Sequence, residues 1–180
     1  MHFQPRDLAL RDGRTVTLRA VLPDDEEEIL QAFDRMGPDA RYMRFMSARR
    51  YLNPERLRTV LHSFPERGMA LAATVPATDG LDIVGTASIL LTNQPGTAEF
   101  AISIVDAWAG AGLGRALLEA LLAIAHDRGL FRVEGFVLAS NAPMLGLASR
   151  VGFIERRDPQ DPAIRIVTFI LDRAPDPSSS

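Results

Sequence analysis

The segment VDAWAGAGLGRALLEALLAIAHDRGL, residues 105–130, places three glycines directly before a long apolar helix pattern. Each of Gly110, Gly112 and Gly114 would cost about 1 kcal/mol relative to alanine in regular structure, so bare backbone must serve a purpose here. The apolar spacing after them predicts a helix from about Gly112 to Asp127. A strand, a glycine loop and a helix N-terminus together leave free N–H groups at the positive end of the helix dipole. The segment therefore predicts a cradle for phosphate.

Two common phosphate-binding loops fit this segment poorly. The run GAGLG at residues 110–114 has the spacing GxGxG, whereas a dinucleotide-binding fold needs GxGxxG in its first strand–helix unit. A P-loop ends in GK[ST], but here Arg115 and Ala116 follow the last glycine. The spacing therefore disfavours both a dinucleotide-binding protein and a P-loop nucleotide-binding protein.

Hydrophobic periodicity divides the rest of the chain into strands and helices. Alternation predicts strands over residues 13–21, 68–76, 82–92, 97–105, 132–138 and 164–171. Helix patterns cover residues 22–36, 37–47, 53–64 and, with Asn141 as N-cap, 142–151. This order predicts an antiparallel meander that leads into crossover helices. We therefore expect a mixed α/β sheet in a single domain, residues 1–172, followed by a flexible proline- and serine-rich tail, residues 173–180.

Composition narrows the classes of function. The chain has 180 residues, 47% of them hydrophobic, and a formal net charge of -3, which gives no overall basic field for nucleic acid. Without cysteine there are no disulfides, thiolate metal sites or cysteine nucleophile. His2, His62 and His126 stand apart without metal-ligand spacing, so we expect no metal. Since we find neither a signal-peptide pattern nor an apolar run of bilayer length, we expect a cytoplasmic protein without a membrane partner.

Two ordered motifs resemble those of the GNAT superfamily of N-acetyltransferases. The stretch VDAWAGAGLGRALL, residues 105–118, is similar to the superfamily's acyl-CoA-binding motif, written Q/R-x-x-G-x-G/A. The stretch NAPMLGLASRVGF, residues 141–153, is similar to the next motif, and a predicted strand separates the two. The resemblance extends from about Arg14 to Leu171. It implies acetyl-CoA as cosubstrate and a mostly antiparallel twisted sheet, split around the cofactor, with helices on both faces.

A narrower resemblance, to the catalytic domain of bacterial protein lysine acetyltransferases, rests on three stretches and one spacing. The stretches are RDGRTVTLRAVLPDDEEEILQAF (11–33), ARYMRFMSARRYLNPERL (40–57) and AEFAISIVDAWAGAGLG (98–114). The N-x-x-M-x-x-L spacing of Asn141, Met144 and Leu147 agrees. This resemblance implies acetyl transfer to a primary amine, with a protein lysine as the leading acceptor. A small-molecule amine acetyltransferase and a non-catalytic or regulatory acyl-CoA-binding module stay open as alternatives, as do a monomer and a homodimer.

The resemblance assigns cofactor contacts to the end of a strand, the glycine loop and the second motif. By position these are Ile104, Val105, Gly110, Ala111, Gly112, Leu113, Gly114, Arg115, Asn141 and Met144. The chain departs from the superfamily pattern at Ala109, where Gln or Arg is usual, and at Ala111, where an arginine is common. Loss of one charged contact to phosphate would weaken binding by about 1–3 kcal/mol. Arg115, in the first turn of the helix, is the residue placed to compensate.

Glu99 is the predicted general base, since an amine acceptor is protonated at pH 7 and must lose a proton before it attacks. The superfamily's usual tyrosine acid is absent, because Ala148 occupies its position, and the resemblance to the lysine acetyltransferases implies a glutamate base. Strand alternation puts Glu99, Ala101 and Ser103 on one face, and a carboxylate beside a partly apolar cleft has a raised pKa. On charge pattern alone, Glu99 is instead a solvated glutamate paired with an arginine. Glu134 is the second candidate for the base.

Four arginines crowd the stretch RYMRFMSARR: Arg41, Arg44, Arg49 and Arg50. One interpretation makes them a wall of the acceptor site or a contact for the 3′-phosphate of coenzyme A. The other is a solvated helix face behind which Tyr42, Phe45 and Met46 are buried.

Overall fold

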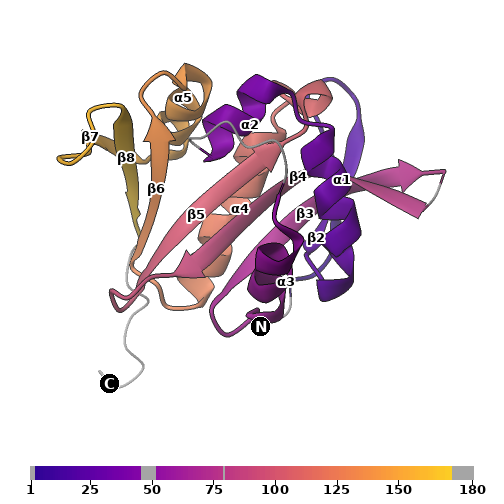
Figure 1. The fold of residues 1–180 in the computed structure, drawn as a ribbon, viewed down its shortest axis with the longest axis horizontal. Helices are drawn as coiled ribbons and strands as arrows, with labels where there is room; N and C mark the ends of the chain where they lie inside the picture. The colour runs from indigo at the N-terminus through magenta and orange to yellow at the C-terminus, as the bar shows by residue number, and fades with distance from the viewer. Residues whose placement is uncertain (1–2, 46–51, 79, 172–180) are drawn as a thin grey trace.

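The computed structural model describes residues 3–45, 52–78 and 80–171. An eight-stranded sheet forms its centre, in the order β1-β2-β3-β4-β5-β6-β8-β7 (Figure 1). The strands are β1 (Arg6–Ala9), β2 (Thr15–Ala20), β3 (Gly68–Ala77), β4 (Gly80–Leu91), β5 (Thr97–Ile104), β6 (Arg132–Leu138), β7 (Ile154–Arg157) and β8 (Ile164–Ile170). The helices are α1 (Glu26–Asp34), α2 (Pro38–Phe45), α3 (Pro54–His62), α4 (Leu113–Asp127) and α5 (Ala142–Val151), with 3₁₀ turns η1 (Pro23–Asp25) and η2 (Asp106–Trp108).

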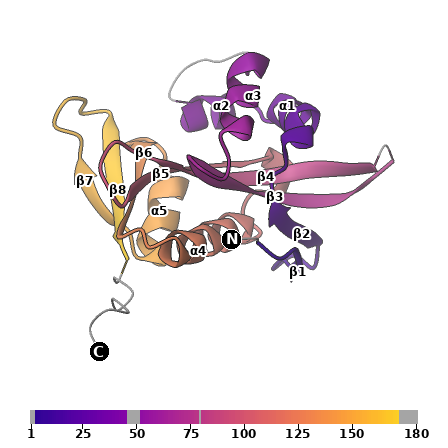
Figure 2. The ribbon, with the colours of Figure 1, turned by 90° about the horizontal axis from the view of Figure 1, so that it is seen from below.

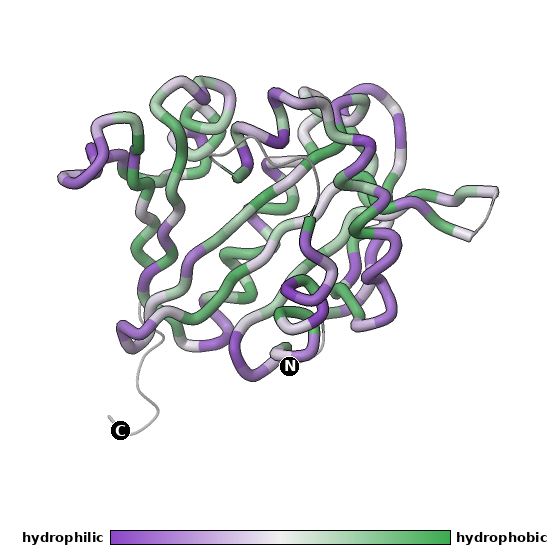
Figure 3. Tube along the Cα trace, viewed as in Figure 1, coloured by the Kyte–Doolittle hydropathy of each residue, from purple (hydrophilic) through white to green (hydrophobic). Residues whose placement is uncertain are grey.

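Helices cover both faces of the sheet, with α1, α2 and α3 on one side and α4 and α5 on the other (Figure 2). Leu117, Leu118 and Leu121 of α4 are at most 1% exposed and pack into the main core with residues of the strands. Burial of each such side chain contributes about 1.5–3 kcal/mol. Hydrophilic residues are frequent along α1, whereas α4 and the central strands carry apolar ones (Figure 3). The amphipathic pattern of the helices thus fixes which side of each one meets the sheet.

The sheet splits between β5 and β6. These two strands are parallel, and their ladder, which lies wholly in the described part of the chain, pairs residues 97–99 with 132–134. Beyond it the strands diverge (Figure 1). The Phe100 ring lies directly against Gly135, where a Cβ would collide with it. An aromatic row behind the split continues from Phe100 to Phe153 and Phe169, with ring centroids 5.2 and 5.3 Å apart.

The predicted mixed α/β architecture is confirmed. From β2 to β5 the strands pair antiparallel in sequence order, which is the predicted meander. Helix α4 then crosses over to the parallel strand β6, and α5 follows β6. The six predicted strands and the five predicted helices all form, with ends close to those expected; the expected end of the helix over residues 37–47 lies outside the described residues. The helix predicted over residues 22–36 begins with the 3₁₀ turn η1, and Pro23 is tolerated in this first turn because the N–H that it lacks would have no helical partner there.

Strands β1 and β7 are absent from the sequence prediction, which was wrong at these two places. β1 is four residues long with the sequence RDLA, and β7 has the sequence IERR with every residue exposed. β7 has no buried side chain, and β1 packs a single half-buried apolar residue, Leu8, against the core, so neither shows the alternation that marks a strand. Each forms because an antiparallel partner lies beside it, β2 for β1 and β8 for β7.

None of the helices in the described ranges combines the length and the apolar character needed to cross a membrane. The predicted tail, residues 173–180, lies outside the described residues. The single-domain boundary at residue 172 stays a prediction.

Candidate functional site

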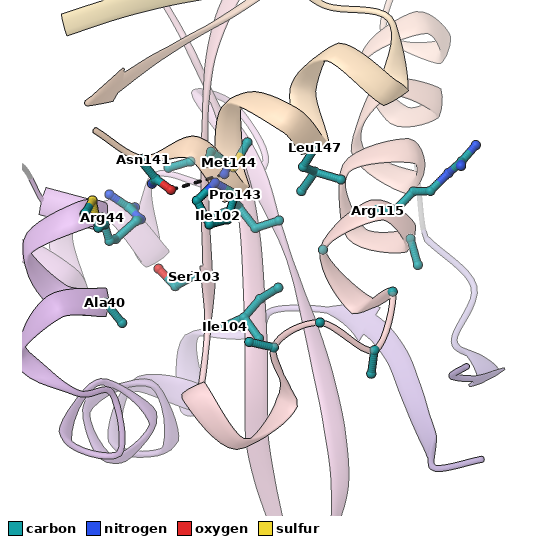
Figure 4. A pocket seen from close by; sticks show the side chains of 18 of the residues that line it. Ala40, Arg44, Ile102, Ser103, Ile104, Arg115, Asn141, Pro143, Met144 and Leu147 are labelled. Atoms are coloured by element: carbon teal, nitrogen blue, oxygen red, sulfur yellow. Dashed lines mark hydrogen bonds between the residues drawn. The ribbon is translucent and has the colours of Figure 1, made fainter. Parts of the chain in front are cut away.

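A pocket of about 730 Å³ opens where β5 and β6 separate (Figure 4). Its walls come from α2, the turn between β1 and β2, β5, the glycine loop with the start of α4, β6 and the start of α5. The predicted cofactor residues among those that line it are Ile104, Gly110, Ala111, Gly112, Gly114, Arg115, Asn141 and Met144. Glu99 lines the same pocket. Segments far apart in the sequence therefore meet at the split in the sheet.

The glycine loop adopts a backbone that favours glycine. Gly110 and Gly112 have φ angles of +78° and +97°, in the left-handed region that L side chains rarely occupy. Gly112 is the N-cap of α4. A Cβ on Gly114 would lie 3.1 Å from both Ile104 Cδ1 and Leu147 Cδ2, so the first turn of α4 packs tightly against β5 and α5. Two glycines thus shape the loop and the third permits close packing.

The amides of residues 110–115 are the chemically important feature of the loop. Within the described residues they donate no hydrogen bond to a protein acceptor. The next amide, that of Ala116, donates to Gly112 O at 3.2 Å and begins the regular helix pattern. Free amides at a helix N-terminus beside a pocket are suited to bind an anion, since the helix dipole adds partial positive charge.

Two predicted cofactor residues hold positions behind the pocket. The Leu113 side chain is 1% exposed and packs in the main core, so only its backbone belongs to the loop surface. Val105 is 8% exposed, lies in the smaller apolar cluster under α1 and α3, and donates its amide to Val84 O at 3.0 Å. Both residues support the loop by packing.

The start of α5 forms the opposite wall. Asn141 Oδ1 accepts a hydrogen bond from Met144 N at 3.1 Å, which confirms the predicted N-cap. This bond uses the carbonyl oxygen of the side chain and leaves its amide nitrogen to the pocket. The side chains of Met144 and Leu147 lie beside it on the same wall (Figure 4).

The arginines near the loop differ in their partners. Arg115 Nε lies 2.7 Å from Glu119 Oε1, one turn along α4, so its charge is compensated on the helix surface. Arg11, in the turn between β1 and β2, donates from Nη2 to Gly110 O and from its backbone N to Ala111 O, both at 3.1 Å. Sequence reasoning missed Arg11, because the contact spans 99 residues of sequence and depends on the short strand β1.

Glu99 lies at the end of the pocket distant from the loop. Its side chain is exposed to the pocket, and it forms no ion pair with any described residue. Partial desolvation raises the pKa of the Glu99 carboxyl above its usual value, the positive charge of Arg44 opposes this shift, and the negative charge of Glu134 adds to it. Of the interpretation from the charge pattern, the exposed side chain is found, whereas no described arginine lies within ion-pair distance of Glu99.

Glu134, the second candidate, has a structural partner. Its carboxylate is paired with Arg132 of the same strand, and its Cα is the register partner of Glu99 across the β5–β6 ladder. Ala148, at the position of the superfamily's usual tyrosine, is 1% exposed and sits in the core. Of these groups, only Glu99 is an unpaired carboxylate on the pocket wall.

The arginine cluster divides between the described and the remaining residues. Arg44 of α2 lines the pocket, and Arg41 Nε donates to Met36 O at 2.9 Å. Arg49 and Arg50 lie outside the described residues. Tyr42 is 45% exposed, which contradicts the interpretation that buries it, and Met46 lies outside the described residues. Elsewhere in the described chain, no three His, Cys, Asp or Glu side chains gather as a metal ion would require.

Comparison with known proteins agrees with this geometry. The family described as Acetyltransferase (GNAT) domain matches residues 15–154. Acetyltransferase PA5475 of Pseudomonas aeruginosa is 29% identical over 153 residues, which are 85% of this chain and 82% of that protein. The GNAT domain of S. lividans PAT has a TM-score of 0.84 at 26% identity, over 93% of this chain and 97% of that one. The structure of yncA from Salmonella typhimurium with its cofactor acetyl-CoA shares the fold, with a TM-score of 0.73 at 18% identity over 92% and 99% of the two chains.

Proposed function

Because the chain belongs to the GNAT acetyltransferase family, we propose that it transfers the acetyl group of acetyl-CoA to a primary amine, with a protein lysine as acceptor. Support for the donor comes from the unpaired amides of residues 110–115, in the loop that lines the pocket. From Ile104 beside the loop to Glu99, β5 extends about 17 Å. An extended pantetheine arm is of comparable length, so one ligand bound along β5 would bring its thioester near the carboxylate.

The donor is held mainly by backbone. The amides of residues 110–115 donate to the diphosphate, and the dipole of α4 stabilises its negative charge. The side-chain amide of Asn141 and the thioether of Met144 face the arm from α5. When bound, acetyl-CoA supplies an acyl group activated as a thioester.

Glu99 is assigned the role of general base. Its carboxylate accepts a proton from the lysine ammonium, and the neutral amine then attacks the acetyl carbon. A C–N bond forms, the C–S bond breaks, and the remaining proton that the attacking nitrogen loses passes to the leaving thiolate. The raised pKa of Glu99 suits this role, because a base is most effective when its pKa lies nearer the working pH.

The acceptor class rests on the resemblance to bacterial protein lysine acetyltransferases and on charge. The Glu99 carboxylate lines the pocket and has no ion-pair partner among the described residues, so it is suited to receive an ammonium group. The observation that carries the proposal is that one pocket has free amides at one end and an unpaired carboxylate at the other.

The test is a thiol-release assay with acetyl-CoA and a panel of lysine-containing proteins, alongside calorimetric titration with acetyl-CoA. Glu99→Gln should lower kcat by about 10²–10⁴-fold, since it removes general base catalysis, while the Kd for acetyl-CoA stays unchanged. Glu134→Gln is the matched control and should retain turnover at pH 7. Equal activity in Glu99→Gln and the unaltered enzyme would exclude Glu99 as base.

A non-catalytic or regulatory acyl-CoA-binding module is the alternative that a specific observation favours. Ala109, Ala111 and Ala148 each replace a side chain that the superfamily commonly uses. The thiol-release assay separates the two, because a module would bind acetyl-CoA without releasing thiol to any amine. A panel of small amines in the same assay separates a small-molecule acetyltransferase from a protein-lysine one. A cytoplasmic location and a monomeric or homodimeric state stay predictions.

A further inference from the structure

Arg11 reaches the glycine loop from the other end of the chain. Besides its bonds to Gly110 O and Ala111 O, its Nε lies 3.3 Å from the position that a Cβ on Gly112 would occupy. The backbone of Arg11 is therefore bonded to Ala111, its guanidinium group is held against Gly110 and Gly112, and Arg11 itself lines the pocket. One of its N–H groups is used by Gly110, and the others remain available to a ligand.

The charge of Arg11 is uncompensated within the described residues. No described carboxylate lies within ion-pair distance of it. Its two neighbours differ in this respect, because Arg14 pairs with Asp12 at 2.5 Å and Arg115 pairs with Glu119 at 2.7 Å. Of the three arginines Arg11, Arg14 and Arg115, Arg11 is the one whose charge no described carboxylate compensates, so it would offer a phosphate placed on the loop amides an uncompensated cation.

The turn that carries Arg11 is anchored to the loop independently of that side chain. Arg14 Nη1 donates to Ala107 O at 2.9 Å, and the Arg14 guanidinium lies 4.0 Å from the centroid of the Trp108 ring. Leu10, beside Arg11, is 7% exposed and packs in the main core. Because the turn is already fixed, little conformational entropy is lost when Arg11 binds a ligand.

We propose that Arg11 binds the diphosphate of acetyl-CoA and supplies the cation that Ala109 and Ala111 do not. The inference rests on the proposed function, since it assumes that the loop amides hold that diphosphate. A guanidinium group forms charge-assisted hydrogen bonds to phosphate oxygens in a fixed geometry, and one such contact changes affinity about tenfold to hundredfold. The cation thus comes from a β-turn, whereas the superfamily motif places it in the loop itself.

Calorimetric titration of the full chain with coenzyme A and with 3′-dephospho-coenzyme A tests the inference. Arg11→Met should weaken the binding of both ligands by about tenfold to hundredfold and should reduce the salt dependence of the Kd. Arg56→Met, at an exposed position of α3 remote from the pocket, is the matched control and should leave both unchanged. Arg115→Met should weaken binding less than Arg11→Met does, because Glu119 already compensates the charge of Arg115.

The outcomes are distinguishable. If the unaltered chain binds neither ligand, the proposed function fails; if it binds both and Arg11→Met equals Arg56→Met, only this inference fails. A loss confined to coenzyme A would assign Arg11 to the 3′-phosphate and overturn the diphosphate assignment. Arg11→Gln, which keeps a polar donor but removes the charge, should reproduce the loss and serves as the second variant if Arg11→Met does not fold.

Discussion

At the end of the pocket beside α4, the groups that face a ligand are peptide nitrogens; at the end beside α2, they are side chains. The first end is a continuous stretch, residues 110–115, whose conformation is set by glycines. The second end combines Glu99 of β5, Phe136 of β6 and Arg44 of α2, and α2 contacts both strands across the split. A backbone site depends on local conformation and tolerates changes in sequence that preserve it. A side-chain site depends on the pairing of distant segments and can vary its specificity without altering the fold.

The largest effect is expected from a charged side chain placed at the α4 end of the pocket, where peptide nitrogens of residues 110–115 face the ligand. Gly112→Glu would put a carboxylate where the diphosphate is proposed to lie and would impose a φ of +97° on an L residue. We expect acetyl-CoA affinity to fall at least about 100-fold, from repulsion and from loss of the amide surface. Calorimetric titration measures the loss.

Gly112→Ala is the control for backbone strain alone. It should lower the free energy of unfolding by about 1–2 kcal/mol and weaken binding far less than Gly112→Glu. Retention of near-normal affinity in Gly112→Glu would show that the amides are not the phosphate site. The whole contrast between the two ends would then fail.

The side-chain end is tested by its pH dependence. The proposed base must be deprotonated, so kcat/KM should fall tenfold per pH unit below the raised pKa of Glu99, at higher pH than for an ordinary glutamate. Glu134→Gln removes a negative neighbour and should move this acidic limb to lower pH. Arg44→Met removes a positive neighbour and should move it to higher pH.

The pH dependence of acetyl-CoA binding completes that test. The Kd for acetyl-CoA should not follow the same limb, because peptide amides do not titrate in this range. If both variants leave the limb in place, a group other than Glu99 sets it, and the assignment of the base is wrong.

The same division explains what the sequence could predict. The glycine loop, α4 and the cap at Asn141 follow from neighbouring residues, so their types and spacing predict them. The position of Arg11 depends on β1, whose four residues show no alternation, and on contacts spanning about a hundred positions. Likewise, only the β5–β6 register reveals that Glu134 adjoins Glu99, and only the structure reveals that Arg132 pairs with Glu134.

The smallest effect is expected at Asn141, whose side chain both caps a helix backbone and faces the donor. Its Oδ1 caps α5 through Met144 N, and its side-chain nitrogen is free to face the donor. Asn141→Ala should lower the free energy of unfolding by about 1 kcal/mol through loss of the cap, measured by urea denaturation. Asn141→Asp keeps the capping oxygen but lacks the N–H donor, so it should preserve stability. If the side chain also binds acetyl-CoA, both variants raise the Kd. If neither variant loses affinity, Asn141 only caps α5, and this wall of the donor end makes apolar contacts alone.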